Sequence, residues 1–393
     1  MSARSEEMNA RRISDSAPLL SWATLPFYIG GFLGPFGTIL VIAIYPELRD
    51  EFDATTAAVN WSFSGYLLPM AALMLVSGTI GERYGRARVT RITFISYAVA
   101  SLAAVFAPTL GVFLAARVLQ GMCNAFITPL LLAGLIEIIP PSRTGGAVGI
   151  YSSFQAAGST AAPLAAGGLA VIDWRWAFVL LAVVAGLLAL RPAPGAPRPG
   201  AEAPKLRPLL TWRMAVLWLA AFLGAAGPLG VAVFVGLYLR DELDVGSFAA
   251  GASLAVIGAA GAVASPLLGR VLDSVGPVRA SVMAMSSCGV LIALVGLVGS
   301  PVVLTAVMVV AMVGVAFGVV ILQHLAALAV PENRGGGTSS VLSFRFAGHA
   351  IGPLALVPVF TRSPGLTFVI VALLAAATMV ALVAAARTSS PDA

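Results

Sequence analysis

The sequence predicts an all-α integral membrane protein with twelve transmembrane helices in two six-helix repeats. Three observations lead to this prediction: a very apolar composition, apolar blocks of about twenty residues, and an internal repeat. Hydrophobic residues make up 59% of the 393 residues and charged residues only 10%, and the mean hydropathy is +0.97. A soluble domain carries roughly 25% charged residues. The composition therefore excludes a soluble enzyme, a nucleic-acid-binding protein and a disordered chain.

Twelve apolar blocks are long enough to cross the hydrocarbon core of a bilayer. We expect helices, because lipid satisfies no backbone polar group and the blocks lack the alternation of a membrane barrel. The first block is too long for the core of a signal peptide, so we expect it to stay in the mature chain. The expected spans are 24–45, 57–80, 89–107, 109–139, 146–170, 175–190, 214–237, 247–268, 280–298, 301–330, 338–360 and 366–386.

The orientation follows from the arginines and lysines in the loops. With the N-terminus inside, 17 of the 23 basic residues lie on the cytoplasmic side, four lie outside, and Arg117 and Arg345 fall within spans. We therefore predict a multi-pass protein of the inner (plasma) membrane with both termini in the cytoplasm.

One loop differs from the others in composition. Residues 191–213 are rich in proline, glycine and charge, which neither continue a helix nor sit in lipid. We interpret this segment as a cytoplasmic linker. The predicted division is a tail at 1–23, a six-helix bundle at 24–190, the linker at 191–213, a second bundle at 214–386 and a tail at 387–393.

The two halves resemble each other at an offset of about 191 residues. Gly78, Glu82, Gly85 and Arg88 match Gly269, Asp273, Gly276 and Arg279, and Arg49-Asp50-Glu51 matches Arg240-Asp241-Glu242. Repeats of six spans place a substrate site near the midplane, between halves that rock against each other. The repeat therefore indicates a secondary transporter, and the alternative is duplication without transport. The sequence has no GxxxxGK[ST] phosphate-binding loop that would indicate drive by ATP.

Three stretches carry a family resemblance. GTIGERYGRAR (Gly78–Arg88) resembles the signature loop of the major facilitator superfamily, and Arg117-Val118-Leu119-Gln120-Gly121 is similar to that family's R-x-x-Q-G motif. The fifth span resembles the helix motif of the drug:proton antiporters through Gly158, Pro163, Gly167 and Gly168. In the first span, Phe36 stands where many such antiporters have an acid.

The signature loop predicts a conformational latch at the cytoplasmic boundary. Glycines allow helix ends to approach closely, and a carboxylate is favoured near a helix N-terminus. The resemblance implies that Glu82, Arg86 and Glu137 form a charge cluster that stabilises the outward-facing state, whereas Arg83 and Arg91 are more simply topology anchors. The predicted latch residues are Gly78, Glu82, Arg83, Gly85, Arg86, Arg88, Glu137, Gly269, Asp273 and Gly276.

Arg117 heads a polar stripe in the fourth span. Arg117, Gln120, Asn124 and Thr128 follow at i, i+3, i+7 and i+11 and share one helix face. A charge inside a membrane is costly and should face a cavity or a partner. We expect this stripe to line the substrate cavity, and the alternative is a structural arginine that bonds neighbouring backbone carbonyls.

A second polar group lies in the C-terminal half. His324 lies in the tenth span, and Arg345 and His349 share a face of the eleventh. Histidine changes charge near neutral pH, and no acidic residue lies deep in a span, so a histidine is the simplest proton carrier. The alternative is a neutral histidine that bonds across helices. The small residues and Pro163 of the fifth-span motif similarly serve either the transport cycle or plain helix packing.

Together these features predict proton-coupled efflux of a small amphipathic molecule by alternating access. Uptake or exchange of a small organic or inorganic anion is the alternative, because Arg117 and Arg345 would make the cavity positive. A non-transporting membrane sensor is a third possibility. The expected partners are the substrate, protons and the lipid bilayer. We expect a monomer with no enzymatic activity, cofactor, metal or nucleic-acid partner.

Overall fold

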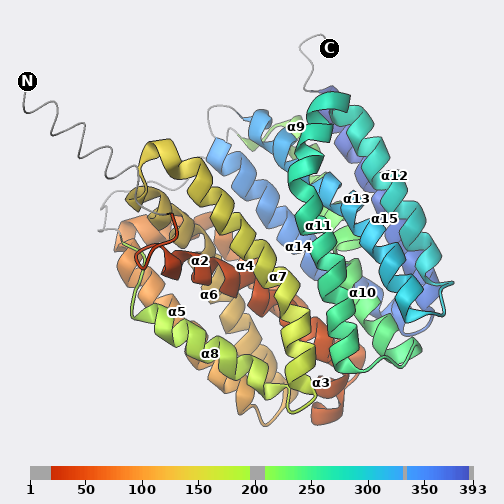
Figure 1. Ribbon diagram of the computed structural model, residues 1–393, viewed down its shortest axis with the longest axis horizontal. Coiled ribbons are helices and arrows are strands. Elements are labelled where there is room, and N and C mark those ends of the chain that lie inside the picture. Colours follow the sequence, from red (N-terminus) through yellow and green to blue (C-terminus); the bar gives the residue numbers. More distant parts are fainter. Residues whose placement is uncertain (1–18, 195–208, 331–333, 389–393) are drawn as a thin grey trace, which may run out of the picture.

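The chain folds into helices that run between two opposite ends of the molecule (Figure 1). The structure, a computed structural model, describes residues 19–194, 209–330 and 334–388, and within these ranges every regular element is helical. The first half contains α2 (Leu25–Ile39), η1 (Leu40–Ile44), α3 (Tyr45–Phe52), α4 (Thr56–Tyr84), α5 (Arg86–Val105), α6 (Leu110–Ile138), η2 (Pro141–Arg143), α7 (Thr144–Ala170) and α8 (Arg175–Ala189). The second contains α9 (Trp212–Gly224), η4 (Ala225–Leu229), α10 (Val231–Leu237), η5 (Tyr238–Glu242), α11 (Ser247–Val275), α12 (Pro277–Val295), α13 (Pro301–Ala329), α14 (Arg334–Phe360) and α15 (Pro364–Arg387).

The all-α prediction is confirmed, and its twelve segments correspond to twelve helical passes. In the described part of the chain, ten helical runs are long and apolar enough to cross a membrane. The other two passes are α8, with 15 residues, and α7, with 27. Glycine, alanine and serine dominate α7, which lowers its hydropathy. These small residues serve a different purpose, since α7 packs against the other half of the molecule.

Local sequence explains where the helices begin and break. Thr55, Thr109 and Thr211 each accept a hydrogen bond from the backbone N–H three residues later, which satisfies one of the free donors of a helix N-terminus. Gly85 and Gly276 separate α4 from α5 and α11 from α12, with φ of 89° and 78°. Such angles favour glycine, and the two glycines occupy matching positions of the repeat.

The first and seventh passes are longer than expected from the sequence. They run over Leu25–Phe52 and Trp212–Glu242, beyond the expected ends at 45 and 237. Both passes contain an irregular stretch close to a proline. Pro35 lies four residues before the end of α2, which η1 follows, and Pro228 lies inside η4. Proline removes a backbone donor and loosens the helix. The charged ends of these passes continue as helix because ion pairs at the molecular surface satisfy them.

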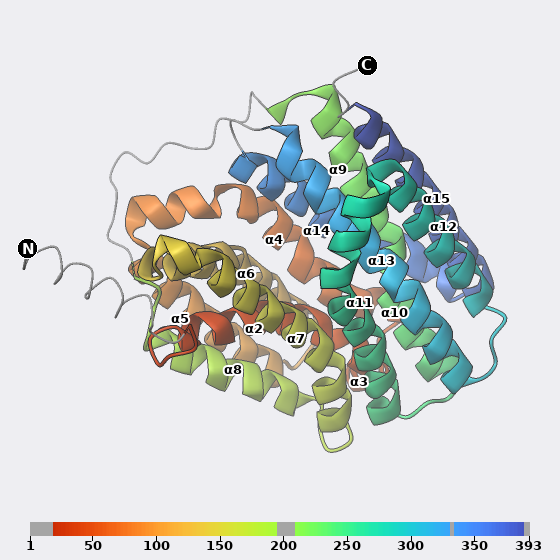
Figure 2. The same ribbon diagram turned by 45° about the horizontal axis from the view of Figure 1, so that its top comes forward.

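The helices form two groups that meet along two long contacts. In Figures 1 and 2, α2–α8 lie on one side and α9–α15 on the other. The halves meet where α4 packs against α14 and where α7 packs against α11. The end of the molecule where α4, α6 and α15 finish is called the inner end below, and the end where α3 and α5 finish is called the outer end.

The repeat is visible in the packing. A side chain at Gly158 of α7 would meet the backbone of Phe32, and one at Gly348 of α14 would meet the backbone of Phe222. Gly158 and Gly348 are 190 residues apart in the sequence, and so are Phe32 and Phe222. The predicted domain boundaries remain a prediction, and most of the two tails and of the 191–213 linker lies outside the described residues.

Candidate transport pathway

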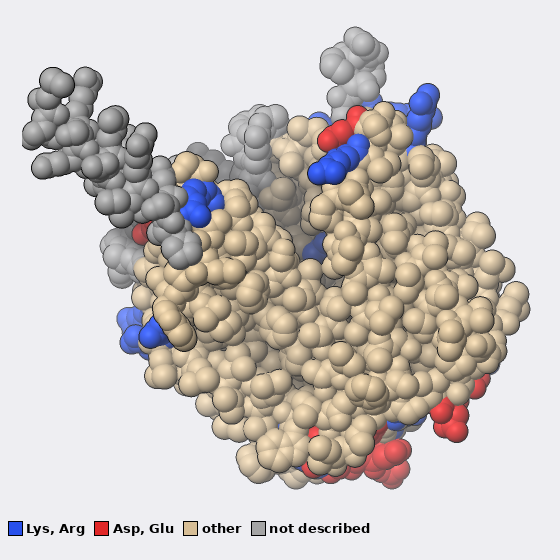
Figure 3. Space-filling view, viewed as in Figure 1, with Lys and Arg blue, Asp and Glu red and all other residues tan. Residues whose placement is uncertain are grey.

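A cleft separates the two halves at the inner end. The space-filling view shows it as a hollow between the groups of helices, with a basic side chain visible in its depth (Figure 3). The outer end shows no such hollow on this face, and acidic side chains gather there. On this face the two halves are therefore apart at the inner end and in contact at the outer end.

Two ion pairs join the halves at the outer end. The guanidinium of Arg49 donates to both carboxylate oxygens of Asp241, at 2.9 and 2.6 Å. The guanidinium of Arg240 donates to Glu47 at 2.6 Å. These four residues, Arg49, Asp241, Arg240 and Glu47, are called the outer clasp. Both arginines are among the four basic residues expected outside, and the repeated Arg-Asp-Glu triplet was a signal of their shared position.

Close backbone contact between α7 and α11 also closes this end. A side chain at Gly167 of α7 would meet the backbone of Ser247, and one at Gly251 of α11 would meet the backbone of Pro163. Gly168 has more room, since the nearest atom to an added methyl is 3.6 Å away on Phe248. Pro163, Gly167 and Gly168 of the fifth-span motif thus lie at the contact between the halves, whereas Gly158 packs against α2 within the first half.

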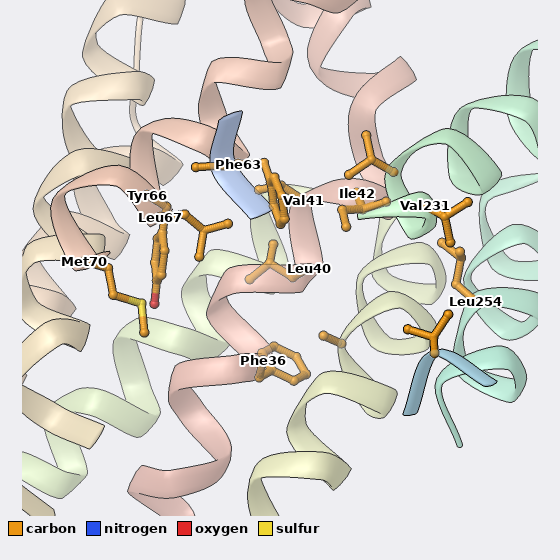
Figure 4. Packing of buried hydrophobic residues seen from close by; sticks show 14 of the residues in the cluster. Phe36, Leu40, Val41, Ile42, Phe63, Tyr66, Leu67, Met70, Val231 and Leu254 are labelled. Carbon is orange, nitrogen blue, oxygen red and sulfur yellow. The ribbon is translucent and has the colours of Figure 1, made fainter. Parts of the chain in front are cut away.

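Apolar side chains fill the space just behind the clasp. Figure 4 shows Ile42 of η1 near Val231 of α10 and Leu254 of α11, with Phe36 and Leu40 following along the same pass. Ile42, Val231 and Leu254 are at most 5% exposed. This packing excludes water between the halves on the outer side.

The second contact between the halves involves His349. Its ring lies edge-on to Phe63 of α4, with centroids 5.0 Å apart, and the Ser64 hydroxyl of α4 donates to the Ala350 carbonyl at 2.8 Å. His349 is 9% exposed, and its Nε2 has no hydrogen-bond partner among the described residues. The structure thus places this histidine at the α4–α14 contact.

Arg117 lies inside the N-terminal half, and each of its three guanidinium nitrogens has a hydrogen-bond acceptor. It donates to the Ser62 carbonyl at 3.0 Å, the Gly37 carbonyl at 2.9 Å and Gln120 Oε1 at 2.6 Å. Its guanidinium also lies 4.4 Å from the centre of the Tyr66 ring, and the residue is 0% exposed. Arg117 therefore ties α2, α4 and α6 together.

The rest of the predicted polar stripe follows Arg117 into the bundle. Gln120 and Asn124 are at most 1% exposed, and Gln120 donates to Ser101 at 2.8 Å. Thr128 is half-buried and donates to Asn124 at 3.2 Å. In this conformation the stripe packs between helices of one half and does not form an open wall. Its role in transport stays a prediction.

Arg345 has no such partners. It lies in the middle of α14 and is only partly buried. Its Nε has no hydrogen-bond partner, and no hydrogen bond or ion pair of this side chain occurs within the described residues. The contact found for its charge is the ring of the neighbouring Phe346, at 5.5 Å. His324 is an exposed residue of α13. No contact between His324 and His349 occurs among the described residues.

The latch residues are brought together only in part. Arg86 and Glu137 form an ion pair at 2.6 Å between the start of α5 and the end of α6. Glu82 is half-buried and Asp273 is exposed, and neither has an ion pair within the described ranges. Arg83 lies over the Tyr84 ring, Arg88 is exposed, and Gly78 and Gly269 face open space. This is compatible with a latch that is disengaged while the inner end is open, and the role stays a prediction.

The chain resembles known transporters in both sequence and structure. It is 30% identical over 181 residues to the tetracenomycin C resistance and export protein of Streptomyces glaucescens, covering 44% of this chain and 34% of that protein. It is 33% identical over 157 residues to a puromycin resistance protein of Streptomyces alboniger, covering 39% and 31%. The matches thus span about a third of the length of these relatives.

A solved structure shows the same fold over nearly the whole chain. It is described as a bacterial homologue of the human lysosomal transporter Spinster, in an inward-facing and occupied conformation. The TM-score is 0.73 at 19% identity, with 95% of this chain and 96% of that chain covered. The model of the Major Facilitator Superfamily matches residues 27–353. The chain is therefore a multi-pass membrane protein of a transporter family, and it belongs to the Major Facilitator Superfamily.

Proposed function

We propose that this protein exports a small amphipathic molecule by alternating access, in exchange for protons. The observation that carries the proposal is the difference between the two ends: the halves are joined by the outer clasp at one end and lie apart in the inner cleft at the other. Ion pairs and small-residue contacts are interactions that two rigid halves can break and remake. Export is supported by the relatives named for antibiotic resistance and export.

The proposal includes the setting of the protein. We place it in the plasma membrane with both termini in the cytoplasm, so that the inner cleft faces the cytoplasm, and we propose that it works as a monomer. The distribution of arginines over the loops supports this orientation. The two six-helix bundles would be the moving bodies, with the 191–213 segment as their linker.

Proton exchange rests on the histidines. Every described carboxylate lies in a loop or within five residues of the end of its helical pass. The charge-changing groups within the passes are then histidines. His349, with a free Nε2 at the α4–α14 contact, is positioned to sense whether the halves are together.

The test compares two adjacent glycines. Gly167→Ala would push against the Ser247 backbone when the outer end closes, whereas Gly168→Ala has room. We expect Gly167→Ala to lower transport about tenfold or more, since each 1.4 kcal/mol of strain in one state is a factor of ten. Gly168→Ala should stay close to wild type.

Transport is measured in everted membrane vesicles with an imposed pH gradient and a pH-sensitive dye. Tetraphenylphosphonium, 1-naphthylacetamide and 1-naphthylacetate serve as a cationic, a neutral and an anionic probe. Collapse of the gradient with any probe, lost in Gly167→Ala and kept in Gly168→Ala, would support proton-coupled alternating access. Equal behaviour of both variants and of vesicles without the protein, for every probe, would contradict it and favour a non-transporting role.

A further inference from the structure

The side chain of Arg345 borders a small cavity inside the C-terminal half. The cavity has a volume of about 20 Å³, room for about one water molecule, and is bordered by residues of α9, η4, α12, α13, α14 and α15. Apolar side chains such as Met285, Leu322 and Leu382 make up most of its lining, and Thr378 is the other lining residue with a polar side chain. The Thr378 hydroxyl already donates to the Leu374 carbonyl at 2.7 Å. The cavity therefore combines one cation with an apolar surface, and we call it the Arg345 pocket.

No protein anion neutralises this cation in the described part of the molecule. The elements that border the pocket contribute no carboxylate to it. The titratable neighbour on α14 is His349, one turn further along, which offers no negative charge. Across the α4–α14 contact, α4 contributes Phe63 and Ser64 at this level, which are uncharged.

A guanidinium at this depth is costly unless something pairs with it. An arginine fork binds a carboxylate or a similar planar oxyanion with two parallel hydrogen bonds. An apolar surface beside it suits a hydrocarbon or aromatic body. A cation would be repelled by the same charge, which no nearby acid offsets.

We propose that the Arg345 pocket binds the acid group of the transported molecule, so that the cargo is an amphipathic organic anion such as a lipophilic carboxylate. This rests on the proposed export function and narrows its substrate class. Outward movement of an anion is also favoured by a membrane potential that is negative inside. The pocket thus selects by charge, and its apolar lining contacts the part of the molecule next to the acid group.

The test measures binding to the purified full chain in detergent by isothermal titration calorimetry. Three probes share one naphthalene ring: 1-naphthylacetate, 1-naphthylacetamide and 1-naphthylethylammonium. We expect the carboxylate to bind at least about tenfold more tightly than the other two, as one good charged pair requires. Arg345→Gln should reduce carboxylate binding to the level of the amide.

Two further variants keep the result interpretable. Arg345→Lys retains the charge without the fork and should bind the carboxylate with intermediate affinity. Arg387→Gln removes an exposed arginine at the end of α15 and should bind like wild type. If Arg345→Gln does not give a monodisperse protein, the Lys variant and the three-probe comparison still decide the question.

Several outcomes would overturn the proposal. They are unchanged carboxylate binding in Arg345→Gln, ammonium binding as tight as carboxylate binding in the wild type, or no carboxylate binding at all. Binding is measured without transport, so its failure is separate from that of the vesicle experiment. Charge-selective binding with no export would retain the site and reject the export function.

Discussion

Arg117 and Arg345, the arginines in the middle of membrane-spanning passes, have opposite surroundings. Arg117 reaches two backbone carbonyls, one side-chain amide and an aromatic ring, and none of its surface is exposed. Within the described residues, the guanidinium of Arg345 has the ring of Phe346 as its one charge contact, and it borders a cavity whose lining holds no acid. Each of the three guanidinium nitrogens of Arg117 donates a hydrogen bond to the protein, and those of Arg345 donate none within the described residues. The difference teaches that depth in the membrane does not by itself distinguish a structural arginine from one whose donors are free to bind a ligand.

The repeat makes the difference sharper. The position matching Arg117, 191 residues on, is Met308, which is fully buried in α13. The position matching Arg345, 190 residues back, is Gln155, which is half-buried in α7. Each half therefore places its arginine where the other half has an uncharged residue. Backbone contacts such as Gly158–Phe32 and Gly348–Phe222 keep the repeat, whereas these charges break it.

The largest effect on stability is expected from replacing Arg117. Arg117→Ala leaves the Ser62 and Gly37 carbonyls and Gln120 without their donor, and we expect it to lower the free energy of unfolding by about 3–5 kcal/mol. Arg345→Met removes an unpaired charge from an apolar pocket and should leave stability unchanged or higher. Denaturant unfolding in detergent measures both. Equal losses in the two variants would break the comparison, because Arg345 would then have structural partners of its own.

A smaller effect is expected from a bound acid, which should stabilise the protein only when Arg345 is present. A saturating acid should stabilise the wild-type protein by about 2.7 kcal/mol at a ligand concentration one hundred times its Kd. 1-Naphthylacetate is the probe, and the melting temperature is the readout. The melting temperature of Arg345→Met should not rise with the acid, whereas that of Arg387→Gln should rise as in the wild type. A rise in Arg345→Met would place the acid elsewhere.

The smallest effect concerns the aromatic contact of Arg117. Tyr66→Leu removes the ring that lies 4.4 Å from the guanidinium. Such a contact contributes about 0.5–2 kcal/mol when desolvated. Tyr66→Phe keeps the ring. The difference in unfolding free energy between the Leu and Phe variants therefore contains the charge–ring contact together with the lost packing of the buried ring. No difference between Leu and Phe would mean that the hydrogen bonds alone hold Arg117.

The sequence alone was sufficient for the architecture. Apolar blocks that are long enough to cross a bilayer must form helices, because lipid does not satisfy the hydrogen bonds of the backbone and the blocks lack the alternation of a membrane barrel. The matching of Gly85 with Gly276 revealed the repeat, and both adopt the positive φ that glycine favours. Arg86 and Glu137 were expected together from the family resemblance and form an ion pair. These features are local or periodic, so they can be read along the chain.

Tertiary structure decided which of the predicted polar residues have hydrogen-bond partners within the protein and which have donors without a partner among the described residues. The acceptors of Arg117 are carbonyls 55 and 80 residues away, and backbone carbonyls carry no sequence signal. The outer clasp joins residues 192 and 193 positions apart, in segments that look like ordinary charged loops. Whether a buried arginine is satisfied depends on which helices pack around it, and long-range packing sets that. The same cause explains why Gly167 is tight and Gly168 is not, although the two glycines are neighbours.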